Sequence, residues 1–250
     1  MWAGSSSPTE RRAAIAALAL LLALWAPPAT AQRADVDMAL VLAVDGSASV
    51  DFQEFVLQMN GIAAAFRDPA VVAAVAGGPR GRIAVALMVW SGLDNPVGGV
   101  GWHVVEDAAS ATRFSEAARR LQRPVRPGAT AINFAIRSAV DMMEASGFDA
   151  DRRVVDLSGD GRENNVLDAL AATDAGRREA VALGVTVNGL PILTDDPDLE
   201  RYFLENVVGG PGAFMIAARN YDDFARAMRE KLLREIEGEL LIGALSEAQE

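Results

Sequence analysis

An unbroken run of seven apolar residues, Met38–Val44, constrains the fold of this chain more than any other feature of its sequence. A run of that length is typical of a strand buried on both faces, as in the middle of a parallel sheet. The run ends abruptly at Asp45, and Ser47 and Ser49 follow at alternate positions. In open α/β sheets, ligands bind in the crevice outside the carboxyl ends of the strands. These three oxygen-bearing side chains are therefore expected at a ligand-binding edge.

Two interpretations of this Asp-x-Ser-x-Ser pattern are open. Carboxylate and hydroxyl oxygens suit a hard cation such as Mg²⁺, Mn²⁺ or Ca²⁺ better than they suit zinc or copper. In the plainer interpretation, Ser47 or Ser49 caps the helix that follows. This stretch alone does not separate a cation site from a helix cap.

The first 31 residues have the parts of a secretory signal peptide. Arg11 and Arg12 form the charged region, Ala13–Trp25 the apolar region, and Ala29-Thr30-Ala31 a small-x-small cleavage site. The apolar stretch is shorter than the roughly 20 residues of a transmembrane helix, and the chain has no cysteine for a lipid anchor. The sequence therefore predicts export, to the periplasm or beyond the cell, and a mature protein that begins at Gln32.

Removal of residues 1–31 leaves one expected domain, 32–250, with its core at about 37–236 and a C-terminal tail at 237–250. The loss of two arginines from 23 basic residues and one glutamate from 34 acidic ones leaves 21 and 33, a net charge of −12. Such an acidic surface argues against nucleic acid and anionic membranes as partners. We expect no membrane span in the mature chain and a monomeric domain.

Strand and helix patterns alternate along the chain, which predicts an α/β fold with a doubly wound, mostly parallel sheet and helices on both faces. A short edge strand, Trp102–Val105, is expected to return antiparallel beside Arg82–Trp90. The topological switch point should lie beside the first strand. The other strands are expected at Met38–Val44, Arg152–Ser158, Val185–Leu190 and Gly212–Ala217, and the helices at Asp51–Phe66, Ala70–Ala76, Ala108–Leu121, 132–143, Leu167–Leu183, Asp196–Glu205 and Tyr221–Ile236.

Two further loops carry oxygen side chains toward the same edge of the predicted sheet. Asp160 follows the strand Arg152–Ser158 between two glycines, and Thr130 lies in a loop that contains Gly128. Glycines at these positions would allow a close approach of the backbone. Considered alone, Asp160 is explained as a turn residue and Thr130 as a helix cap. With Asp45, Ser47 and Ser49 they offer two carboxylates and three hydroxyls.

In this order, Asp45-x-Ser47-x-Ser49, Thr130 and Asp160 resemble the metal-ion-dependent adhesion site of von Willebrand factor type A domains, with all five positions present. The resemblance covers essentially the mature chain, from about residue 37 to residue 236. Within the family, the chain resembles exported bacterial A-domain proteins of uncharacterised function. It implies a Rossmann-like fold and a Mg²⁺-type ion, or Mn²⁺ or Ca²⁺, held by the three hydroxyls, with the two carboxylates acting directly or through water. It also implies a binding module in which the ion takes a Glu or Asp of a partner protein.

The main alternative is a metal-dependent phosphoryl-transfer enzyme with Asp45 as its nucleophile. That chemistry commonly needs a second acid two residues on, where this chain has Ser47, and a lysine for the phosphate, yet the only lysine, Lys231, lies in the last predicted helix. A serine triad would depend on His103, the only histidine, which is expected at the surface. We therefore predict that the protein is not an enzyme, and a structural scaffold with an unoccupied site is the third possibility.

Other polar residues near these loops are expected to be solvated. Glu163 and Asn164 follow the Asp160 loop: they could line the rim of the site, but the default interpretation is that they are solvated polar residues. Four arginines at the end of the predicted helix at 108–121 and in the segment after it are interpreted as a solvated face and not as an anion site: Arg119, Arg120, Arg123 and Arg126.

Overall fold

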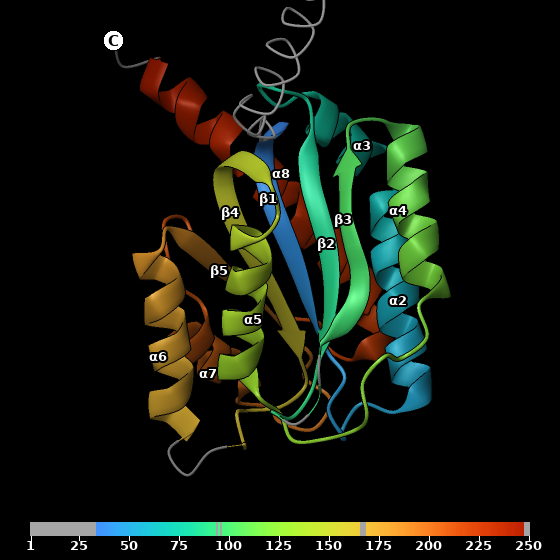
Figure 1. The fold of residues 1–250 in the computed structure, drawn as a ribbon, viewed down its shortest axis with the longest axis vertical. Helices are drawn as coiled ribbons and strands as arrows, with labels where there is room; N and C mark the ends of the chain where they lie inside the picture. Colours follow the sequence, from blue (N-terminus) through green and yellow to red (C-terminus); the bar gives the residue numbers. More distant parts are fainter. Residues whose placement is uncertain (1–33, 94, 96, 166–168, 248–250) are drawn as a thin grey trace, which may run out of the picture. The chain divides into compact units, whose positions relative to one another are not determined.

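The computed structural model describes residues 34–93, 95, 97–165 and 169–247 (Figure 1). The predicted signal peptide lies outside the described residues. The strands are β1 (Ala34–Asp45), β2 (Ile83–Trp90), β3 (Gly98–Val105), β4 (Phe148–Gly159) and β5 (Val185–Pro191). The helices are α2 (Phe52–Phe66), α3 (Pro69–Ala76), α4 (Ala108–Arg120), α5 (Ile132–Glu144), α6 (Ala169–Ala182), α7 (Leu199–Tyr202) and α8 (Phe224–Glu247), with a π turn η1 (Phe203–Val207) and a 3-10 turn η2 (Tyr221–Asp223).

The strands in the described part of the chain form one sheet in the order β3-β2-β1-β4-β5. β1 is parallel to β2 and β4, β5 is parallel to β4, and β3 is antiparallel to β2 at the edge. Every residue of β1 from Val36 onward is buried, as its apolar run predicts. From β1 the chain first adds β2 and β3 on one side of the sheet and then β4 and β5 on the other side. The topological switch point therefore lies at the carboxyl end of β1. The predicted doubly wound, mostly parallel fold is confirmed.

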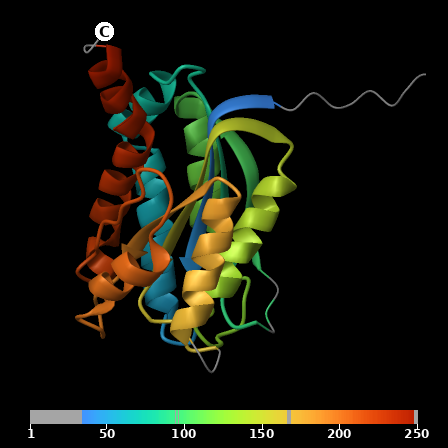
Figure 2. The ribbon, with the colours of Figure 1, turned by 90° about the vertical axis from the view of Figure 1, so that its left-hand side faces the viewer.

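Helices cover both faces of the sheet (Figures 1 and 2). Successive residues of β1 point to opposite faces, so Leu42 packs with Phe66 and Phe114 in the core beneath α2, α3, α4 and α8. Val41 packs with Ile136 in the second core, beneath α5, α6 and η1. The two cores hold β1 as a rigid central element.

The prediction of a last strand at Gly212–Ala217 is wrong. This segment follows the edge of the sheet beside β5 but makes isolated bridges in place of a ladder. The side-chain oxygen of Asn188 accepts the amide of Phe214 at 2.9 Å, where a ladder would use a main-chain carbonyl. Gly210, with φ of 101°, also turns the chain just before the segment. The apolar residues of Gly212–Ala217 thus match the pattern of a strand, but the segment lacks the continuous main-chain pairing of one.

The antiparallel edge strand is longer than predicted, because β3 begins at Gly98 instead of Trp102. A Cβ on Gly99 would lie 1.9 Å from the carbonyl oxygen of Leu87, so β3 approaches β2 too closely there for any other residue. The glycines that suggested a loop are thus part of the strand.

The last helix carries charged residues into the interior. Lys231 is fully buried, and its Nζ lies 2.8 Å from Asp156 Oδ1 of β4 and 2.5 Å from Glu235 Oε1 on the next turn of α8. Asn188 of β5 donates to the same oxygen of Glu235 at 2.9 Å. Burial, assisted by the charge of Glu235 and opposed by Lys231, raises the pKa of Asp156 to about 7. This charged cluster ties α8 to two strands of the sheet.

Candidate metal centre

Asp45 is the last residue of β1, and Ser47 and Ser49 follow it in the loop. β1 ends at the lower end of the sheet in Figure 1. Asp45 is 0 % exposed, and its Oδ1 accepts a hydrogen bond of 2.7 Å from the amide of Ser47. The hydroxyls of Ser47 and Ser49 are 3.1 Å apart. The helix that follows is capped by Asp51 in a capping box with Glu54. The interpretation of Ser47 or Ser49 as its cap is therefore wrong.

Thr130 and Asp160 reach the same place from the other two loops. Thr130 Oγ1 lies 3.4 Å from Ser47 Oγ, and Asp160 Oδ1 accepts a hydrogen bond of 2.7 Å from Ser49 Oγ. The residue at the cap position of α5 is Ala131, with no side-chain cap bond, so Thr130 is not its cap. The structure thus brings all five predicted site residues together.

The three hydroxyls form a chain of hydrogen bonds that runs from Thr130 to Ser47 and Ser49 and ends at Asp160. Since Ser49 donates its single hydroxyl hydrogen to Asp160, Ser47 must be the donor in its contact with Ser49. Thr130 in turn donates to Ser47, over a distance that is long for a hydroxyl pair. Asp45 Oδ2 is buried and has no hydrogen-bond partner among the described residues. A buried carboxylate oxygen without a partner is costly, and a bound cation would satisfy it.

Main-chain and amide contacts hold the three loops in place. The amide of Ala48 donates to the carbonyl of Gly128 at 2.8 Å. Asn164 brackets Thr130 from both sides: its Oδ1 accepts the Thr130 amide at 2.8 Å, and its own amide donates to the Thr130 carbonyl at 3.0 Å. Asn164 is exposed, as expected of a solvated residue, and it also fixes the threonine of the site.

The glycines beside Asp160 leave room for the cluster, as the sequence predicts. A Cβ on Gly159 would lie 2.9 Å from Asp45 Oδ2, and one on Gly161 would lie 3.3 Å from Thr130 Oγ1. Any larger residue at Gly159 would push into the carboxylate whose oxygen is unpartnered.

Arg123 does not belong to a solvated face. Its guanidinium donates to the carbonyls of Ser47 at 2.6 Å and Val50 at 2.8 Å, and also to that of Gly46. These bonds fix the loop that carries two of the hydroxyls. The partners are more than seventy residues apart in the sequence, so no local pattern predicts the contact.

Glu163 is also buried, contrary to expectation, at 5 % exposure. Its carboxylate accepts the amides of Asn133 at 2.9 Å and Asn165 at 3.2 Å. It therefore closes the first turn of α5, whose N–H groups would otherwise be unpaired. Burial raises the pKa of Glu163, and those amide bonds oppose the shift.

Burial and the charge of the neighbouring Asp160 together raise the pKa of Asp45 to about 7, against hydrogen bonds from Ser47 and from the backbone of Asp160 that lower it. A carboxylate in this position binds a proton tightly when nothing positive is nearby. Protons and a cation are thus expected to compete for the same buried oxygen.

We therefore expect the affinity for Mn²⁺ to fall as the pH is lowered below about 7, by roughly tenfold per unit, because the cation needs Asp45 ionised. Stability of the metal-free protein should show the opposite trend. The pKa of Asp45 is about 4 in the unfolded chain and about 7 in the native state. Its protonated form therefore stabilises the native state fully below about pH 4, and this stability is lost as the pH rises through about 7.

Titration calorimetry with Mn²⁺ at about pH 5.5, 6.5 and 7.5 measures this dependence. Asp156→Asn is the control, since it removes the other carboxyl group whose pKa is raised to about 7 and should leave the pH dependence of affinity intact. A dissociation constant that stays constant over this range would contradict the competition.

The donor set of this cluster suits a hard cation. All five side chains offer oxygen, which Mg²⁺, Mn²⁺ and Ca²⁺ prefer. Within the described residues, no three His, Asp or Glu side chains converge in an arrangement that would hold a metal ion. A cation at this edge would therefore depend on the hydroxyls of Ser47, Ser49 and Thr130 as much as on carboxylates.

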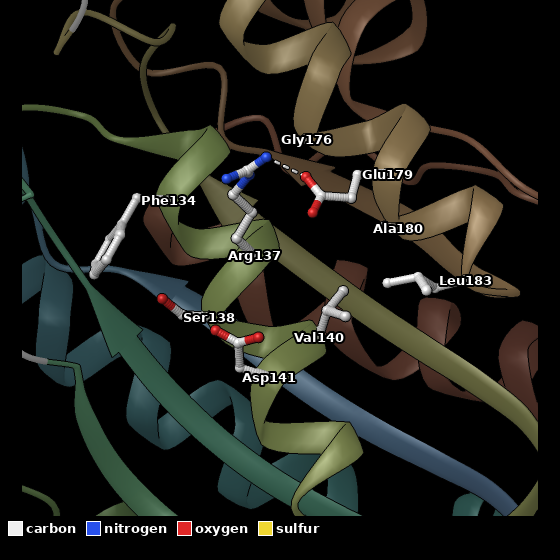
Figure 3. Close-up of a pocket in the computed structure, with 9 residues that line it drawn as sticks. All are labelled: Phe134, Arg137, Ser138, Val140, Asp141, Gly176, Glu179, Ala180 and Leu183. Carbon is white, nitrogen blue, oxygen red and sulfur yellow. Dashed lines mark hydrogen bonds and ion pairs between the residues drawn. The ribbon is translucent and has the colours of Figure 1, made fainter.

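A separate cleft of about 300 Å³ lies between α5 and α6 (Figure 3). Phe134 and Val140 contribute apolar surface, and an ion pair between Arg137 and Glu179 crosses it. None of the five residues of the oxygen cluster lines this cleft. It is therefore distinct from the candidate metal centre.

Comparisons with known proteins agree with this fold. The model of the family described as "Protein of unknown function (DUF1194)" matches residues 35–240. The pilus adhesin SpaC from Lactobacillus rhamnosus GG has a similar structure, with a TM-score of 0.60 and 17 % identity over 81 % of this chain. Proximal thread matrix protein 1 from the mussel byssus aligns with a TM-score of 0.53 and 16 % identity over 80 % of this chain. The chain spans 31 % and 47 % of the length of these two structures.

A comparison of the sequence with curated proteins gave no match. In the part of the chain that the structure describes, no helix has both the length and the apolar character needed to cross a bilayer.

Proposed function

The chain belongs to the DUF1194 family of proteins of unknown function and has a von Willebrand factor type A-like fold, and from this premise we propose that it is an exported protein-binding module. Its metal centre would consist of Asp45, Ser47, Ser49, Thr130 and Asp160. The partner would be a protein that presents a Glu or Asp side chain to a divalent cation, Mg²⁺ or else Mn²⁺ or Ca²⁺.

The observation that carries the proposal is the convergence of five oxygen-bearing side chains around the unpartnered Oδ2 of Asp45. Three of the five are neutral hydroxyls, so two formal negative charges would face a divalent ion. Mg²⁺ tends to keep waters and to bind through one or two carboxylates, rather than accept a complete protein cage. Once bound, such an ion would supply a positive, exchangeable position for an external carboxylate.

The net charge of the protein supports a partner that is attracted by the bound cation and not by the protein surface as a whole. The whole chain carries a net charge of −11, so long-range attraction would not favour an acidic partner. Binding should therefore be lost when the cation is removed, and also when the key Glu or Asp of the partner is replaced by its amide.

The predicted signal peptide and the two similar structures support the exported part of the proposal. The byssus protein and the pilus adhesin are named for material outside cells. Neither likeness exceeds 17 % identity, so the argument for export rests on Arg11, Arg12 and the apolar stretch after them.

Capture from cell-envelope extracts tests this function. The folded protein, immobilised, should retain a partner in Mg²⁺ and release it in EDTA at matched ionic strength. Asp45→Asn is the matched negative control, because it keeps the shape of the side chain and removes its charge. Equal capture by wild type in Mg²⁺ and in EDTA would overturn the proposal.

We propose a binding role over phosphoryl transfer for two reasons. Asp45 is fully buried with one oxygen held by the Ser47 amide, which suits a ligand better than a nucleophile. Lys231 is fully buried and already paired with Asp156 and Glu235. Turnover of a generic phosphatase substrate by wild type, lost in Asp45→Asn, would favour the enzyme instead.

A further inference from the structure

Both carboxylate oxygens of Asp160 are engaged in the structure. Ser49 donates to Oδ1 at 2.7 Å, and the hydroxyl of Tyr221 donates to Oδ2 at 2.9 Å. The second bond comes from a residue 61 positions away, in the turn that leads into α8. Asp160 is therefore held from two sides, once within the oxygen cluster and once from outside it.

The ring of Tyr221 is fixed independently of this bond. It is 5 % exposed and belongs to the core beneath α2 and α8. The turn that carries it is closed by Asn220, whose side chain accepts the amide of Asp223 at 3.0 Å. Arg226 pairs with Asp223 at 2.7 Å and anchors the turn to α8. The phenol is thus presented to Asp160 by a rigid support.

The surroundings also keep this phenol protonated. Burial, with the nearby charges of Asp160 and Asp45, raises the pKa of Tyr221 far above its usual range. In the hydrogen bond between them, the hydroxyl of Tyr221 is the donor and Asp160 is the acceptor.

We propose that Tyr221 is a positioning residue of the metal centre. Its hydroxyl restrains Oδ2 of Asp160, so that the carboxylate accepts the hydrogen of Ser49 and that serine, which accepts from Ser47, keeps one lone pair to face a cation. In this arrangement Asp160 acts through water and through Ser49. The inference rests on the proposed metal centre and adds a residue that lies outside its five-residue pattern.

The geometry makes a specific prediction for Tyr221→Phe. Loss of the hydroxyl leaves Oδ2 of Asp160 buried with no donor on that side, so the carboxylate loses its orientation. Removal of such an outer hydrogen-bond partner typically weakens metal binding by roughly tenfold or more. Tyr202→Phe is the matched control, because Tyr202 is also buried and is hydrogen-bonded to Thr173 and the Glu163 amide, neither of which belongs to the five residues.

Two measurements on the full chain test the proposal. Calorimetry with Mg²⁺ gives the affinities of wild type, Tyr221→Phe and Tyr202→Phe. Ring-¹³C tyrosine NMR gives a readout that a merely structural role would not move: the chain has two tyrosines, so Tyr202→Phe assigns both signals. Addition of Mg²⁺ should shift the Tyr221 signal far more than the Tyr202 signal.

The outcomes separate this inference from the function it rests on. A roughly tenfold loss of affinity in Tyr221→Phe alone, with a selective shift of its signal in wild type, supports it. Normal Mg²⁺ binding by Tyr221→Phe, or an unmoved Tyr221 signal at saturation, overturns it and leaves the metal centre standing. Absence of Mg²⁺ binding in wild type overturns both.

Discussion

Replacement of Asp45 by asparagine should abolish the stabilisation of this protein by Mg²⁺. A ligand that binds the native state at about 100 times its dissociation constant adds about 2.7 kcal/mol. For a domain of this size, that corresponds to a rise in melting temperature of roughly 5–10 °C. The variant should show no such rise, because the amide cannot supply the charged oxygen that is buried and unpartnered in wild type.

The same variant should not be destabilised in the absence of metal. Asparagine keeps the Oδ1 contact to the Ser47 amide and removes a charge that burial disfavours. Asp149→Asn is the control: Asp149 is an exposed residue of β4, so the response to Mg²⁺ should be unchanged. Equal melting shifts in wild type and Asp45→Asn, by scanning calorimetry at pH near 8, would place the cation elsewhere.

The largest loss of stability should follow Lys231→Met. The change leaves the carboxylates of Asp156 and Glu235 buried without their cation. Removal of one partner from a buried ion pair typically costs about 3–5 kcal/mol. Urea denaturation should show this loss, and it should be greater at pH 8 than at pH 6, because burial raises the pKa of Asp156 and its carboxyl group can take up a proton at the lower pH.

Two comparisons decide whether the charged cluster is responsible. Arg234→Met removes a positive charge from an exposed site on the same helix, where the guanidinium stacks 4.1 Å from the centre of the Phe214 ring, and should have little effect. The triple variant Lys231→Met/Asp156→Asn/Glu235→Gln should recover most of the stability, since no unpaired charge remains inside. If the triple variant were as unstable as Lys231→Met, lost packing rather than charge would explain the effect.

Much of the fold follows from local pattern. The apolar runs of β1 and β2 mark strands buried on both faces, and the polar residues at their ends mark the carboxyl edge of the sheet. The prediction failed where main-chain pairing depends on a side chain far away in sequence, as when Asn188 takes the amide of Phe214. It also failed at Gly99, where a glycine marks a close approach of two strands and not a loop.

The residues of the candidate site also divide into those that the sequence predicts and those that it does not. Its five core residues could be predicted because each stands in a loop at the sheet edge in a fixed order. Arg123, Asn164 and Tyr221 could not, because their roles come from contacts with loops that only the tertiary structure brings near. The one local signal was the Gly-Asp-Gly segment followed by Glu163 and Asn164, polar residues directly after a strand end.

The central claim is that these loops hold a divalent cation with a position left for a partner. The most direct test is a crystal structure grown with Mn²⁺, with the ion located by its anomalous scattering. We predict an anomalous peak in contact with the hydroxyls of Ser47 and Ser49, with Asp45 and Asp160 beside it and at least one water on the side that faces solvent. A map with no peak between these residues, or an ion enclosed entirely by side chains of this protein, would contradict the account.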